Sequence, residues 1–103
     1  MTRIVADHLP ELIALCRRHQ ARRLALFGSA TGDAFDSSGS DLDFLVEFRP
    51  LAPPDHADSY FGLLHDLEDL FARRVDLLER PPIRNPYLLE AIEESEVVLY
   101  EAA

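Results

Sequence analysis

The apolar positions of this chain recur with two spacings, one typical of helices and one typical of strands. Residues 8–20 show the i, i+3, i+4, i+7 spacing of a helix with one buried stripe. The side chains of this stripe are Leu9, Leu12, Ile13 and Cys16. A second helix is predicted over residues 55–74 from its broad apolar face. A third is predicted over residues 87–94, where Asn85 supplies a capping side chain and Pro86 the first helical position.

Short apolar runs between these helices predict strands, and a stretch rich in Gly, Asp and Ser over residues 31–40 predicts a loop. The strands are expected over residues 24–27, 41–48, 75–78 and 97–100. In the second of them apolar side chains alternate with Asp41 and Asp43, so that one face suits a core. The order of elements predicts an α/β (α+β) fold, a small sheet with helices packed on one side. The pattern alone leaves the strand order open.

Composition narrows the class of protein. We expect residues 1–103 to form a single domain, because this length buries one modest core. Cys16 is the only cysteine, which excludes an internal disulfide and a zinc framework. No apolar run approaches the length of a membrane span and the N-terminus lacks a signal-peptide pattern, so a cytoplasmic location is expected. The formal net charge of −9 disfavours a broad nucleic-acid-binding face and favours a basic protein partner or a polycationic small molecule.

The candidate chemistry lies at the ends of two predicted strands. Asp41 and Asp43 project from one face at the start of their strand, close enough to share a divalent cation, and oxygen ligands of this kind favour magnesium or manganese. Gly28 and Ser29 follow the strand over residues 24–27. Gly28 lets a ligand approach the backbone, and Ser29 offers a hydroxyl at a turn whose free N–H groups attract anions. The two features together predict a metal-assisted phosphate site.

The arrangement of Gly28-Ser29, eleven further residues and then Asp41-Leu42-Asp43 resembles the signature of the nucleotidyltransferase superfamily that includes DNA polymerase beta. The short length resembles its minimal nucleotidyltransferase (MNT) branch, whose members are commonly antitoxins paired with a HEPN-domain toxin. The resemblance implies the mixed, partly antiparallel sheet of the polymerase-beta palm. It also implies a third acidic residue on a later strand, where Asp76 stands. An Arg that many members carry shortly after Gly-Ser has no counterpart in residues 30–33.

By this resemblance the chain transfers AMP from ATP to a hydroxyl, with tyrosine of a HEPN toxin as the implied acceptor. Asp41, Asp43 and Asp76 would be catalytic and would hold two Mg²⁺ or Mn²⁺ ions, and Asp76 would also help to remove the proton of the acceptor. Gly28 and Ser29 would bind the triphosphate. The expected partners are the toxin and ATP, without direct binding of nucleic acid or membrane; a homo-oligomer is left open.

Two alternatives share the motif. A small-molecule nucleotidyltransferase of the aminoglycoside-modifying type fits an acidic surface, although its pocket needs a further domain or a dimer. An antitoxin that acts by binding alone fits the missing Arg, whereas the three carboxylates argue against it. In either antitoxin reading we expect opposite charges to dock the partner, with a basic edge near the strand that leads to Gly28. The arginines of this edge are Arg17, Arg18, Arg22 and Arg23.

Overall fold

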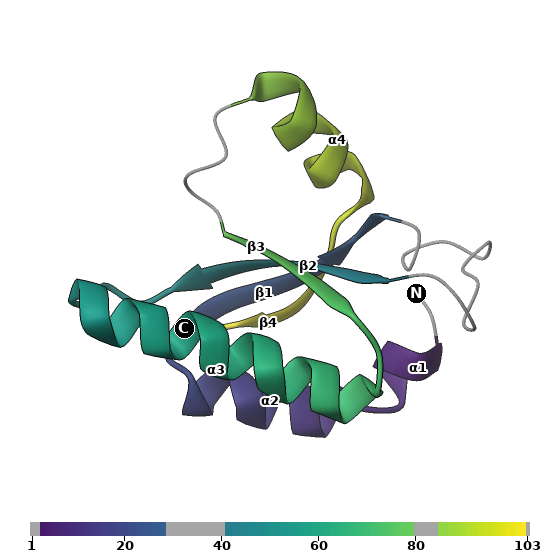
Figure 1. Cartoon of the computed structure of the whole chain (residues 1–103). Helices are drawn as coiled ribbons and strands as arrows, with labels where there is room; N and C mark the ends of the chain where they lie inside the picture. The colour runs from purple at the N-terminus through teal and green to yellow at the C-terminus, as the bar shows by residue number, and fades with distance from the viewer. Residues whose placement is uncertain (1–2, 29–40, 80–84, 103) are drawn as a thin grey trace.

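Four strands form one mixed sheet in the order β3-β2-β1-β4 (Figure 1). The computed structural model describes residues 3–28, 41–79 and 85–102. The strands are β1 (Ala21–Phe27), β2 (Leu42–Phe48), β3 (Val75–Glu79) and β4 (Val97–Glu101). β1 is antiparallel to both of its neighbours, and β2 is parallel to β3. The four predicted strands are confirmed, and the mixed sheet is the one that the resemblance implied.

The helices are α1 (Arg3–Ala6), α2 (Leu9–Arg18), α3 (Pro53–Phe71) and α4 (Pro86–Ser95). All three predicted helices are present, and α1 is an addition of four residues. α3 begins two residues earlier than expected, with proline in its first turn, where the missing N–H costs nothing. It ends three residues earlier because Ala72 takes a left-handed conformation with φ of 52°.

The main core lies between the sheet and the helices α2 and α3. Leu42, Phe44 and Val46 of β2 are fully buried there, as the alternation of the sequence predicts. They pack with Leu12 and Cys16 of α2 and with the buried face of α3. Figure 1 shows α2 and α3 side by side along one face of the sheet. The predicted packing of helices on one side is confirmed for these two.

α4 lies across the sheet from α2 and α3 in Figure 1. Its one buried side chain, Ile92, is among three buried apolar residues in the described part of the chain that lie outside the main core. The other two, Ala25 and Leu45, are register partners on β1 and β2. Leu45 is two residues after Asp43 on β2, so this pair lies on the face of the sheet that carries Asp43. None of the helices described here is long and apolar enough to cross a membrane.

Candidate active site

Asp43 on β2 lies directly opposite Asp76 on β3. The two strands are parallel and in register at this point, so both side chains project from the same face of the sheet. The neighbours of Asp76, Val75 and Leu77, are buried on the other face. A hydrogen bond joins the two carboxyl groups. Asp76, which the family resemblance placed on a later strand, thus faces the same way as Asp43.

The carboxyl group of Asp43 is unusually hard to ionise. Its pKa is raised from 3.8 to about 6, first by burial, then by the hydrogen bond and the charge of Asp76, and last by the charge of Asp41. Burial disfavours the charged form, and each neighbouring carboxylate repels a second negative charge. A cation bound between two carboxylates held together in this way would offset the repulsion between their negative charges.

Asp41 stands at the margin of this pair. It precedes β2 and is half-buried, and it acts on Asp43 through its charge. Within residues 3–28, 41–79 and 85–102, no three His, Cys, Asp or Glu side chains are gathered so that they could hold a metal ion between them. The structure therefore brings Asp43 and Asp76 together, while the place of Asp41 in a shared metal site stays a prediction.

Gly28 lies against Asp43. The register pairs Phe27, the last residue of β1, with Asp43, and Gly28 follows with a positive φ of 76°. A Cβ atom on Gly28 would stand 2.7 Å from Asp43 Oδ2, closer than real Cβ contacts come. Glycine is needed here for both conformation and space. Ser29, the other predicted phosphate-binding residue, lies outside the described residues, so that its role stays a prediction.

Ser95 is a neighbour of the site that the sequence did not reveal. The backbone N–H of Gly28 donates a hydrogen bond to Ser95 Oγ at 3.4 Å. The hydroxyl in turn lies 3.3 Å from the carbonyl oxygen of Ala91 and 3.4 Å from that of Ile92, within the last turns of α4. A serine near the end of a helix carries no signal of such a contact, since only the placement of α4 on the second face of the sheet creates it.

Most arginines of the expected basic edge form ion pairs with carboxylates of this chain. Arg23 is half-buried and bonds Glu96 at 2.7 Å and Glu101 at 3.2 Å. Arg22 bonds Glu47 at 2.9 Å, and Arg18 lies 3.7 Å from Asp66. These ion pairs compensate much of the positive charge that was expected to attract a partner.

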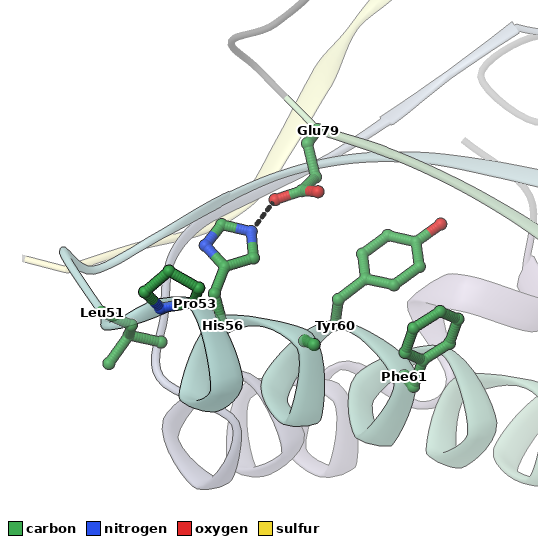
Figure 2. Close-up of a pocket in the computed structure, with 7 residues that line it drawn as sticks. Leu51, Pro53, His56, Tyr60, Phe61 and Glu79 are labelled. Atoms are coloured by element: carbon green, nitrogen blue, oxygen red, sulfur yellow. Dashed lines mark hydrogen bonds and ion pairs between the residues drawn. The ribbon is translucent and has the colours of Figure 1, made fainter.

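A cavity of about 570 Å³ lies between the beginning of α3 and the end of β3 (Figure 2). Its lining residues are Leu51, Pro53, His56, Ala57, Tyr60, Phe61 and Glu79. Glu79 is three residues after Asp76 on β3, so the two side chains project from opposite faces of the sheet. Glu79 therefore lies with Leu77 on the face that packs against α3. The cavity is therefore on the other side of the sheet from the carboxylate pair. His56 of α3 pairs with Glu79 of β3 across the cavity.

A profile of the nucleotidyltransferase domain family matches residues 12–99. A candidate protein adenylyltransferase of Methanocaldococcus jannaschii is 36% identical over 78 residues, which cover 75% of each chain. The solved structure of a candidate minimal nucleotidyltransferase is 32% identical, with a TM-score of 0.69 over 94% of this chain and 95% of the other. The family profile extends over most of the chain and includes Gly28, Asp43 and Asp76.

More distant solved structures share the fold. A complex of a tri-AMPylated Shewanella oneidensis HEPN toxin with its MNT antitoxin matches with a TM-score of 0.64 at 18% identity, over 94% of this chain and 72% of the other. A toxin–antitoxin structure with AMP-PNP matches with a TM-score of 0.67 at 20% identity, over 91% and 73%. The predicted polymerase-beta-like architecture is confirmed by these matches together.

Proposed function

Because the chain belongs to the nucleotidyltransferase domain family, we propose that it transfers AMP from ATP to a tyrosine hydroxyl of a HEPN-domain partner and so acts as an antitoxin. The family confirms the predicted enzyme class, a nucleotidyltransferase. The similarity to a candidate protein adenylyltransferase supports AMP as the group and protein as the acceptor. The shared fold with an AMPylated HEPN toxin–MNT antitoxin complex supports the partner, and the AMP-PNP structure supports ATP.

The observation that carries the proposal is the pairing of Asp43 with Asp76. Two carboxylates side by side, one of them with its pKa raised by burial and repulsion, supply the hard oxygen ligands that suit Mg²⁺ or Mn²⁺. Asp43 and Asp76 would hold the metal, together with Asp41. When bound, the metal supplies positive charge for the triphosphate and for the departing pyrophosphate. Gly28 would let the triphosphate approach the backbone beside Asp43, with Ser29 as a further contact.

In the reaction the oxygen of the acceptor hydroxyl attacks the α-phosphorus of ATP. A new P–O bond forms while the bond from the α-phosphorus to the oxygen bridging to the β-phosphate breaks, and pyrophosphate leaves with that electron pair. The hydroxyl proton passes to a carboxylate oxygen of Asp76, which is exposed and so open to an acceptor. The chain thus contributes mainly position and charge compensation.

The acceptor completes the site. We infer that residues 1–103 act as a single nucleotidyltransferase domain in the cytoplasm and that the specificity for the acceptor comes from a protein–protein surface. An adenylyl group on the partner adds bulk and negative charge near a surface that binds RNA phosphates. Repulsion between this charge and the RNA would silence the toxin.

The test is the intact mass of a HEPN-domain partner encoded beside this chain and co-expressed with it. We expect the wild type to add adenylyl groups to a partner tyrosine. Asp41→Asn combined with Asp43→Asn should bind the partner but leave it unmodified and toxic, whereas Asp69→Asn, an exposed carboxylate change on α3, should act as the wild type does. A partner that gains no mass and is silenced equally by wild type and double variant would show inhibition by contact and overturn the enzymatic proposal.

A further inference from the structure

The apolar face of α3 is only partly covered by the sheet. The buried side chains of this helix are Leu63, Leu67 and Phe71, all in its C-terminal half. The N-terminal half continues the helical spacing with Pro53, His56, Ala57, Tyr60 and Phe61, and these residues line the cavity beside β3. The helix therefore presents an apolar and aromatic surface at the edge of the sheet, where β3 is the outermost strand.

The polar groups of the cavity are held in fixed positions. Figure 2 shows His56 reaching from α3 to the carboxylate of Glu79, with which it pairs. The hydroxyl of Tyr60 donates to the carbonyl oxygen of Leu77 at 2.7 Å. Phe61 packs edge-on against Tyr60 with ring centroids 5.1 Å apart, yet 65% of it is exposed. A large aromatic ring exposed beside a preformed cavity marks a surface suited to a partner.

The described residues in and beside the cavity carry negative charge. Glu79 lines the cavity, and Asp55 and Asp58 are exposed on the first turns of α3. Among the described lining residues the only basic side chain is His56. Burial raises the pKa of Tyr60, and the charges of Glu79 and then Asp76 raise it further. Such surroundings favour a cation with an apolar stem.

We propose that this cavity docks an arginine or lysine side chain that the acceptor protein presents beside an apolar residue. The cation would lie against the aromatic rings and bond the carboxylate of Glu79, while its stem covers Phe61. The acceptor as occupant rests on the proposed function. Asp76 is three residues before Glu79 on the same edge strand, so about 10 Å of backbone separates the docking point from the catalytic face. A protein held at this edge can reach around β3 to present its hydroxyl.

The first experiment uses a probe that needs no partner. N-acetyl-arginine amide is titrated into the ¹⁵N-labelled protein, with N-acetyl-citrulline amide as the neutral analogue of the same shape. We expect chemical-shift changes confined to residues 53–61 and 77–79, several-fold larger for the arginine probe and lost in Glu79→Gln, which keeps a partner for His56. Equal responses to the two probes, no response, or an unchanged response of Glu79→Gln would overturn the proposal.

The second experiment measures affinity for the HEPN-domain partner without nucleotide, so that its outcome does not depend on AMP transfer. Glu79→Gln and Phe61→Ser should each weaken the complex by about tenfold, as expected for a contact at the centre of an interface. The matched controls on α4, Glu90→Gln and Tyr87→Ser, should leave the affinity unchanged; both positions are exposed. If the probe binds but the partner's affinity is unchanged in both cavity variants, the cavity takes a small cation and protein docking is wrong. If Tyr87→Ser weakens the complex and Phe61→Ser does not, the docking surface is α4.

A partner that binds normally but gains no AMP would instead overturn the proposed function and leave the docking site standing. The melting temperature of each variant is recorded beside its affinity. Because Phe61 is exposed and Glu79→Gln conserves shape, both variants are expected to fold.

Discussion

Asp43 and Asp76 share a hydrogen bond between two carboxyl groups on neighbouring parallel strands, although each would repel the other if both were ionised. The chain keeps this pair at the face of the sheet where Gly28 lies against Asp43, with no space for a Cβ atom between them. Burial and the neighbouring charges raise the pKa of Asp43 to about 6. Without metal, the ionised form of Asp43 therefore destabilises the folded state, because unfolding exposes this carboxylate to water and separates it from its neighbours.

The first prediction concerns the stability of the metal-free protein as a function of pH. The pKa of Asp43 is about 6 in the folded state and near 3.8 when unfolded, so the folded state binds the proton more tightly. This contribution to stability is fully present below pH 3.8 and is lost as the pH rises through 6. Asp43→Asn, which stays neutral, should melt at a higher temperature than the wild type at pH 7.5, and the difference should vanish towards pH 4. Calorimetry with EDTA over this range measures it; a difference that does not depend on pH would contradict the assignment.

The second prediction concerns ligand binding. Magnesium with ATP should raise the melting temperature of the wild type, because a ligand that binds only the folded state stabilises it by mass action. At a hundredfold excess over Kd the shift should be on the order of 10 °C for a domain of this size. Asp43→Asn should lose most of it, whereas the control Asp69→Asn should keep it. A full shift in Asp43→Asn would place the nucleotide elsewhere.

The third prediction uses two glycines that are both crowded. Gly28→Ala should abolish AMP transfer and cost about 1–3 kcal/mol of stability, because its Cβ would meet Asp43 Oδ2 at 2.7 Å in a left-handed conformation. Gly62→Ala is the matched control, since its Cβ would stand 2.8 Å from the ring of His19 and α3 packs on the other face of the sheet from Asp43 and Asp76. We expect Gly62→Ala to lower the melting temperature while the transfer rate at 20 °C is retained. Loss of transfer in both variants alike would indicate that stability, and not the site, controls activity.

The fourth prediction concerns the basic edge. Arg23 bonds Glu96 and is largely covered, so Arg23→Gln should leave a half-buried carboxylate without its cation and lower the free energy of unfolding by about 1–3 kcal/mol. Arg17→Gln, at an exposed position of α2, should change it by less than about 0.5 kcal/mol. Urea unfolding compares the two. If Arg23→Gln were as stable as the wild type but bound the partner more weakly, the arginine would serve docking as the sequence first suggested.

The sequence predicted the face of β2 that carries Asp43 because the alternation along a strand is local, whereas Asp76 was expected only from the family resemblance. Leu42 and Phe44 assign one face of β2 to the core, and Asp43 must then lie on the other. A long helix between β2 and β3 also favours a parallel crossover, which brings Asp76 beside Asp43. The position of α4 could not be predicted in this way. Its single buried residue, Ile92, is too weak a pattern to say which face it covers.

The same limit applies to contacts between distant segments. The hydrogen bond from Gly28 to Ser95 joins residues 67 positions apart, and no spacing along the chain encodes it. The four residues of α1 are too few to show a helical period. The sequence assigned Arg23 to a basic edge with other arginines. Its partner Glu96 is 73 residues away, so the sequence does not show that the two side chains form an ion pair.

The last prediction separates the roles of the two paired carboxylates. Asp76 is exposed on the edge strand, whereas Asp43 is partly buried beside Gly28, so Asp76 is the one open to an acceptor. Asp76→Asn should lower the rate of AMP transfer by about 10²–10⁴, the range for loss of a general base, and keep much of the thermal shift with magnesium and ATP. It should also lower the pKa of Asp43, because the amide can donate to the carboxylate and no longer repels it. A ¹³C titration of the Asp43 carboxyl measures that pKa directly, with Glu90→Gln as the control for a distant charge. A pKa that stays near 6 in Asp76→Asn would mean that burial alone raises it. The proposal that Asp43 and Asp76 interact as the central pair of the site would then be wrong.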